Sequence, residues 1–313
     1  MSLLLEIRQK LDAAGAKISE LEQAMLDYPN HAAIAANLES AVRIRQKLEG
    51  QFMEAAARTG VEVCRYRAFD DHDRAQAAPA FTAIAGFQRF VSVVFGAKKN
   101  GRKEKATVTE EESAQSTFNF GFAFTGSVGV VLTIPRDKPM LAESELDDAM
   151  KIVFSMARAK SPGEIQKYAS DLGPGPITAL YQWAKENVTH GLGAEVEWMH
   201  GDTVSERLML QRQELTRLTN AIDETSSSKD DYIEIIGDLR MADVDGRRFR
   251  LAQSKDLRIF KGTVEPGAID QRHRVQLPKK YKARIRRTTT NHLATGVKEV
   301  RYHLMWVAEV DKK

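Results

Sequence analysis

The first sixty residues place apolar side chains at alternating spacings of three and four, and this pattern constrains the fold more than any other. Such spacing is the a/d seam of helices that pack side by side. A break at Tyr28-Pro29-Asn30 divides the pattern, so we expect an antiparallel helical hairpin over residues 1–60. Two helices with narrow seams bury little surface, so we predict oligomerisation through the first seam: Leu4, Ile7, Leu11, Ile18, Leu21 and Met25.

Residues 61–224 mix strand and helix patterns, which predicts a central α/β body. The polar stretch 97–116 is typical of a mobile loop, and Gly-Pro-Gly-Pro at 173–176 indicates a break between helices. Thr203-Val204-Ser205-Glu206 matches a capping box, so we expect a helix from there to about residue 224. That helix would pack against the hairpin, within one chain or across a dimer.

Residues 118–136 contain a glycine-bearing turn that we compare with a phosphate-binding loop. A phosphate loop leads from a strand into a helix and carries a lysine, whereas this turn leads into the strand-like residues 130–134. We therefore interpret it as a β-hairpin, in which Gly121 and Gly129 mark a bulge or a close backbone approach. A ligand pocket at Gly126–Gly129 remains an alternative.

The C-terminal part carries short alternating runs typical of β-strands. Serines and charges at 225–231 predict a linker, and 232–313 is expected to form a small closed barrel, SH3-like or OB-like. The chain is thus expected to be an α+β protein. The expected barrel interior is Leu239, Met241, Phe249, Leu251, Leu257, Ile259, Tyr281, Ala283, Ile285, Tyr302, Leu304 and Trp306.

Composition indicates a soluble globular protein: of 313 residues, 42% are hydrophobic and 28% charged. No apolar run reaches the roughly 20 residues that cross a bilayer, and the N-terminus lacks the features of a signal peptide. The single cysteine, Cys64, excludes an intramolecular disulfide. We expect a cytoplasmic protein that does not associate with membranes.

Charge is distributed unevenly along the chain. Residues 231–313 carry 19 Lys and Arg against 11 Asp and Glu, whereas the remainder carries 27 against 32. Strand periodicity places a row of cations on the outside of the expected barrel, which suits nucleic acid or an acidic protein surface. The alternative is a solvated face that answers acidic groups of the same protein. The candidate binding residues are Lys280, Lys282, Arg284, Arg286, Arg248, Arg250 and Arg301.

Two places in the central body carry residues suited to catalysis. Asp70-Asp71-His72-Asp73 offers carboxylates and an imidazole, and His200 with Asp202 follows a predicted strand. No known catalytic motif accompanies either place, so we assign no catalytic residue, metal ion or cofactor. The favoured function is a non-enzymatic binding or assembly protein. The alternatives are a metal-dependent hydrolase or nuclease with its site at one of these places, and a ligand-sensing regulatory protein.

Overall fold

The protein forms two compact units, Met1–Glu224 and Thr225–Lys313, in the computed structural model. Helices and two sheets are combined, so the expected α+β class is confirmed. The two units are described separately below. The described residues are 2–70, 76–124, 128–135, 144–200, 203–243, 246–269 and 277–310.

The first unit is built on a five-stranded antiparallel sheet in the order β2-β3-β1-β4-β5. Strand β1 lies at its centre because its side chains are buried on both faces. The strands are β1 (Val61–Phe69), β2 (Asn119–Phe124), β3 (Val128–Pro135), β4 (Gly193–His200) and β5 (Thr203–Leu210).

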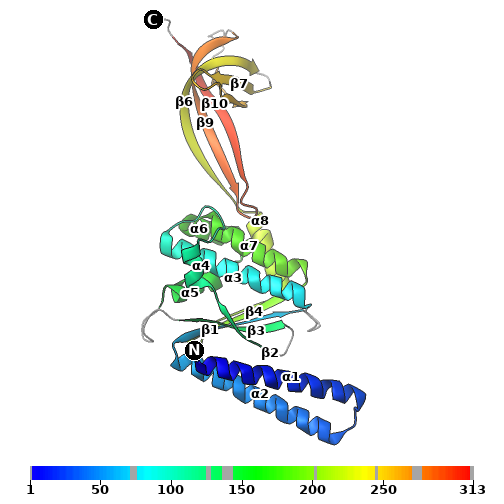
Figure 1. Ribbon diagram of the computed structural model, residues 1–313. Coiled ribbons are helices and arrows are strands. Elements are labelled where there is room, and N and C mark those ends of the chain that lie inside the picture. The colour runs from blue at the N-terminus through cyan, green and yellow to red at the C-terminus, as the bar shows by residue number, and fades with distance from the viewer. Residues whose placement is uncertain are drawn as a thin grey trace. The chain divides into compact units, whose positions relative to one another are not determined.

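Helices cover both faces of this sheet (Figure 1). The expected hairpin is present as α1 (Ser2–Asp27) and α2 (Ala32–Arg58), which lie over one face. The remaining helices lie over the other face: α3 (Ala77–Asn100), α4 (Glu110–Ser116), α5 (Glu145–Ala157), α6 (Pro162–Leu172), α7 (Pro174–Thr189) and α8 (Arg212–Asp223).

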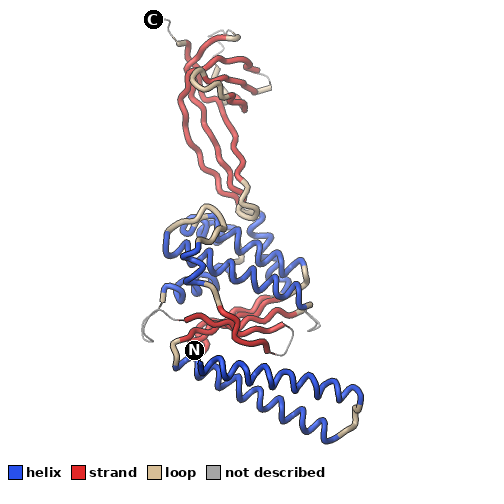
Figure 2. Tube along the Cα trace, viewed as in Figure 1, coloured by secondary structure: helices blue, strands red, loops and turns tan. Residues whose placement is uncertain are grey.

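The hairpin packs on the sheet through only one of its halves. Ile7 and Leu11 join a core cluster with Phe52 of α2 and Val131 of β3. The other half extends past the sheet (Figure 2) and is held by a separate cluster of hairpin residues alone, among them Ile18. The seam of α1 is therefore buried within this chain.

Helix α3 forms the apolar centre of the opposite layer. Within the described residues it is the one helix long and apolar enough to cross a membrane, yet 67% of its most apolar stretch is buried inside the unit, as in the core of a soluble protein. Phe87 lies between the rings of Tyr66 and Trp183, and Trp183 Nε1 donates a hydrogen bond to Tyr66 Oη at 3.0 Å. Cys64 of β1 is fully buried on this side.

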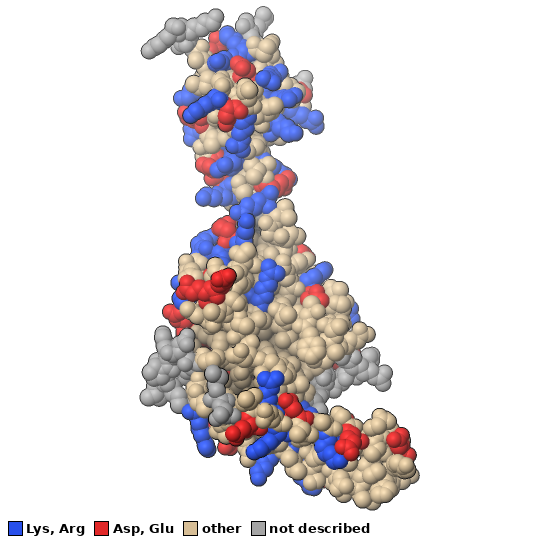
Figure 3. Space-filling model, viewed as in Figure 1, with Lys and Arg blue, Asp and Glu red and all other residues tan. Residues whose placement is uncertain are grey.

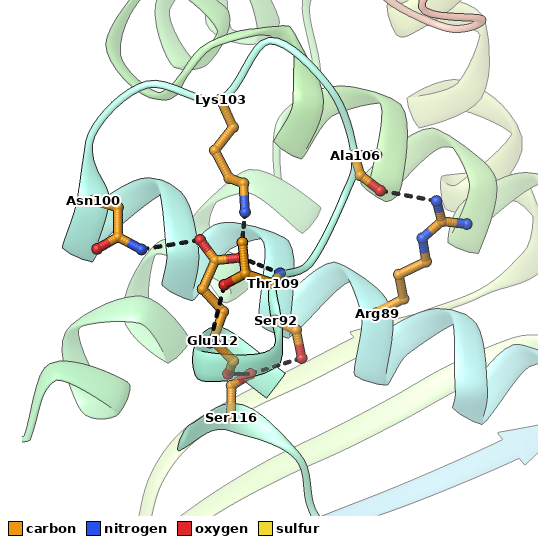
Figure 4. Close-up of polar contacts among 8 residues, drawn as sticks. All are labelled: Arg89, Ser92, Asn100, Lys103, Ala106, Thr109, Glu112 and Ser116. Carbon is orange, nitrogen blue, oxygen red and sulfur yellow. Dashed lines mark hydrogen bonds and ion pairs between the residues drawn. The ribbon is translucent and has the colours of Figure 1, made fainter. Parts of the chain in front are cut away.

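The polar stretch 97–116 was expected to be a mobile loop, and this prediction is wrong. Helix α3 continues to Asn100, and Thr109 caps α4 through a capping box with Glu112. The buried Glu112 carboxylate also accepts hydrogen bonds from Asn100 and Lys103, and these three side chains converge on one point (Figure 4). A local cap and one buried ion pair thus order a segment of polar composition.

The predicted helix over 203–224 is also wrong in its first half. Residues 203–210 form β5, which pairs with β4 and buries Leu208 and Leu210 by strand alternation. The capping box of α8 is made instead by Gln211 and Glu214. Helix α8 packs on α7, so it is part of the layer opposite the hairpin.

Two glycine-rich segments also differ in outcome. The β2–β3 hairpin is confirmed, and a register shift occurs at Gly121, where a Cβ would lie 2.8 Å from Val131 O. The turn itself, with Gly126, lies outside the described residues. The break expected at 173–176 is instead the start of α7, since prolines are accommodated in a first helical turn.

The second unit is a closed barrel in the order β10-β8-β7-β6-β9, as expected. Its interior is filled by alternate side chains of every strand, including Phe249, Tyr281 and Leu304. The strands are β6 (Ser226–Asp243), β7 (Arg248–Gln253), β8 (Ile259–Val264), β9 (Lys279–His292) and β10 (Lys298–Glu309).

Three details of the predicted barrel need correction. The expected linker, from residue 226 to 231, belongs to β6, because it pairs with β9 over Ser226–Asp231. Met241, Leu257 and Ile259 are 41%, 74% and 43% exposed rather than interior. In β8 the neighbouring Phe260 is buried instead.

Candidate functional site

Most candidate cations of β9 are neutralised by acids on the barrel. Lys282 lies 2.9 Å from Glu234 of β6, and this ion pair lowers the pKa of Glu234. Arg286 lies 2.5 Å from Glu265, and Lys280 stands opposite Asp238 in the β6–β9 register. The face that we predicted to be basic is therefore mixed in charge, as the Lys, Arg, Asp and Glu side chains of Figure 3 also show.

Two exposed or half-buried aromatic rings accompany these cations. The Arg284 guanidinium lies over the Tyr232 ring, 5.0 Å from its centre, and Lys282 Nζ lies 5.9 Å from the centre of the Trp306 ring. Tyr232 is 50% exposed, and Trp306 is half-buried on the outer face beside Arg284. The sequence interpretation placed Trp306 inside and so missed these rings.

The cations of β7 have different surroundings. Arg248 and Arg250 are exposed, since Phe249 and Leu251 between and beyond them point inward. Arg250 stands directly opposite Lys261 of β8, which is also exposed. Within the described residues, none of these three cations lies in an ion pair.

The β7–β8 segment as a whole is strongly basic. Residues 246–263 carry six Lys and Arg against one acid, Asp256. The basic hairpin, defined by Arg248, Arg250 and Lys261, is thus the part of the barrel whose charge is least compensated. Lys261 was not among our candidates, although the local charge count would have found it. Arg301, the last candidate, lies 2.9 Å from Glu299, and each raises or lowers the other's pKa toward the charged form.

The structure gives the predicted oligomerisation residues partners within the chain. Ile7, Leu11, Ile18 and Leu21 are at most 8% exposed. Leu4 and Met25, at the two ends of the seam, are half-buried. Oligomerisation through these helices stays a prediction, but these four side chains are already occupied by folding.

The two predicted catalytic places have separate outcomes. Asp71, His72 and Asp73 lie outside the described residues, as does Asp202. His200, however, is brought close to two buried carboxylates: its Nε2 lies 3.1 Å from Asp147 Oδ1 and its Nδ1 lies 3.9 Å from Glu62 Oε1. Sequence reasoning missed both partners, because they lie on β1 and α5, far from His200 along the chain.

Asp147 is held in this place by several donors. Its carboxylate accepts hydrogen bonds from the backbone N–H of Ser144, which it caps at α5, and from Trp198 Nε1 at 3.0 Å. Burial alone would raise the pKa of Asp147, but these hydrogen bonds and the nearby His200 outweigh it and lower the pKa. Asp147 therefore stays ionised in a buried position.

A cavity of about 250 Å³ lies between α2 and the sheet. Met53, Phe122 and Phe124 give it an apolar lining, and Glu49 and Arg65 add charge. Gly129, which we associated with a ligand pocket, is not part of this lining. Instead Gly129 lies against the Phe124 ring, where a Cβ would meet ring carbons at 2.3 Å.

Comparison of the chain with known protein families, with curated protein sequences and with solved structures gave no match. The functional argument therefore depends on the geometry described above.

Proposed function

We propose that this is a binding protein whose C-terminal barrel binds nucleic acid through the basic hairpin. The observation that carries the proposal is the pair of exposed cations, Arg250 and Lys261, directly opposite each other without an acidic partner among the described residues. Like charges at such cross-strand positions destabilise a sheet. A row of phosphates relieves this repulsion, because each Lys or Arg contact neutralises one phosphate charge.

The contrast with β9 supports this choice of surface. Arg287 stands opposite Asp231 on β6, and the two side chains form an ion pair at 2.5 Å. Cations of β9 are thus satisfied within the barrel, whereas those of β7 and β8 are available to a ligand. An acidic protein surface is the competing partner, and it is distinguished by the experiment below. The cytoplasmic location expected from the sequence remains part of the proposal.

The test is the anisotropy of labelled single- and double-stranded DNA and RNA oligonucleotides titrated with the full chain. We expect the logarithm of the binding constant to fall linearly with the logarithm of salt concentration between about 50 and 200 mM. The variant Arg248→Gln/Arg250→Gln/Lys261→Gln should reduce the salt slope by about 2–3 contacts. Absence of binding at low salt would contradict the proposal and favour an acidic protein partner.

The matched control is Lys279→Gln/Lys282→Gln/Arg287→Gln. It removes the same charge from the barrel, but from side chains that lie within 2.9 Å of Glu309, Glu234 and Asp231. We expect this control to retain most of the affinity and the salt slope. An equal loss in both variants would show that only net charge matters, and the proposed surface would be wrong.

A further inference from the structure

The side chains of Glu62, Asp147 and His200 meet at one end of the first unit's sheet, under the start of α5. Val63 pairs with Met199, so Glu62 and His200 are adjacent at the next position on β1 and β4. Strand alternation turns both toward the helical layer, where Asp147 occupies the third position of α5. Three different elements thus bring their side chains to one place.

The donor atoms of these side chains are close enough to share one ion. One ligand atom from each lies within 4.8 Å of the others. Around a tetrahedral ion with bonds of about 2.1 Å, ligand atoms lie about 3.4 Å apart. Small side-chain rotations bring the cluster to that geometry, and the backbone need not move.

Burial and charge favour a cation at this place. Glu62 is 3% and Asp147 is 1% exposed, so two carboxylates meet where water screens them little. The Nδ1 atom of His200 is buried and makes no hydrogen bond with any described residue. An imidazole nitrogen in that state, facing a carboxylate, is a typical metal ligand.

The surrounding residues orient the cluster as outer partners orient the ligands of metal sites. Trp198 Nε1 and the Ser144 backbone N–H fix the Asp147 carboxylate. The His200 ring packs edge-on against Trp198, with 6.2 Å between ring centres. The His200 side chain is 32% exposed, which gives an ion access from that side.

We infer that Glu62, Asp147 and His200 form a binding site for a divalent transition-metal ion, with Zn²⁺ as the best fit. A set of one imidazole and two carboxylates suits Zn²⁺, Mn²⁺ or Co²⁺, whereas Ca²⁺ and Mg²⁺ prefer oxygen ligands throughout. Three protein ligands leave a coordination position for water, as in open zinc sites. This site lies in the first unit and is independent of nucleic-acid binding by the barrel.

The experiment begins with full-length protein freed of metal by a chelator that is then removed. Co²⁺ is added as a spectroscopic probe, and Zn²⁺ is titrated by calorimetry. We expect saturable binding of one equivalent of Co²⁺, visible as d–d absorption that Zn²⁺ abolishes. Co²⁺ should also quench part of the tryptophan emission, because Trp198 contacts both Asp147 and His200.

Near-isosteric variants test the assignment of ligands. Glu62→Gln and His200→Gln should each weaken Zn²⁺ binding at least about tenfold while circular dichroism stays native. His190→Gln is the matched control, because His190 forms an exposed pair with Glu186 at 3.1 Å and should not affect binding. Absence of saturable binding, or equal binding by His200→Gln and the wild type, would overturn the inference.

Discussion

Arg250 of β7 lies directly opposite Lys261 of β8 on the outside of the barrel. Elsewhere in the same barrel, Arg287 lies opposite Asp231 and forms an ion pair with it. One sheet therefore holds both a satisfied and an unsatisfied arrangement of charge. The unsatisfied one lowers the stability of the barrel and leaves two cations available for binding.

Lys261→Glu should stabilise the barrel while it weakens nucleic-acid binding. The new carboxylate would stand opposite Arg250 and replace repulsion by attraction, worth roughly 0.2–1 kcal/mol. Hydrogen exchange of the β7 amides, followed by mass spectrometry, measures this change locally. Faster exchange in β7 would contradict the expectation, and Lys255→Glu, outside the strands, serves as the control of equal charge.

Glu112 should make the stability of the first unit depend on pH. Burial raises its pKa, but hydrogen bonds from Lys103, the Thr109 backbone and Asn100 outweigh burial and bring the pKa from 4.5 to about 2. Because the folded-state pKa is lowered, the stabilisation is complete above 4.5 and is lost as the pH falls toward 2. The loss corresponds to roughly 3 kcal/mol in the free energy of unfolding.

Urea unfolding followed by tryptophan emission at several pH values measures this dependence. Glu112→Gln should lower stability at neutral pH and flatten the acid limb of the profile. Glu111→Gln is the control, since the Glu111 side chain is 71% exposed and should change stability by less than about 0.5 kcal/mol. An unchanged profile in Glu112→Gln would contradict the expectation.

Gly173→Ala should destabilise the first unit strongly. Gly173 has a φ of 88°, and a Cβ at this position would lie 2.3 Å from Lys103 O. Strain and clash together should cost roughly 3 kcal/mol or more. Gly163→Ala, within α6, has nothing within 4 Å of the new Cβ and should stabilise by about 0.4–1 kcal/mol. Thermal unfolding midpoints of both variants compare the two sites.

Leu11→Ala should act on folding rather than on self-association. Leu11 is 3% exposed in a cluster that joins the hairpin to the sheet, so truncation should cost about 2–5 kcal/mol. Leu26, also on α1, is 75% exposed, and Leu26→Ala should be nearly neutral. Light scattering measures the mass of each variant, and denaturation measures its stability. A halved mass with unchanged stability would restore the oligomer seam.

Local patterns predicted those elements whose packing follows from their own periodicity. The heptad spacing from Leu4 to Met25 gave the hairpin, and alternation at Tyr281, Ala283 and Ile285 gave the inward face of β9. It could not assign the partner of the seam. The same apolar stripe packs equally well on a sheet of its own chain or on a second copy.

Predictions failed where distant partners decide between local options. Thr203–Leu210 satisfies a capping-box pattern, but pairing with β4 makes it a strand. In β8 the register differs by one residue from our interpretation, which exchanges Ile259 for Phe260 in the core and turns Lys261 outward. Glu62, Asp147 and His200 share no spacing pattern, since three separate elements bring them together.

The burial of Cys64 makes the rest of the protein simple to label. This cysteine is the only thiol of the chain, it is fully buried, and burial raises its pKa, so it stays protonated and out of reach of alkylating reagents. A second cysteine on the surface, such as Ile259→Cys beside Lys261, would therefore react alone. The wild-type chain already provides the silent background that site-directed fluorophores and spin probes require.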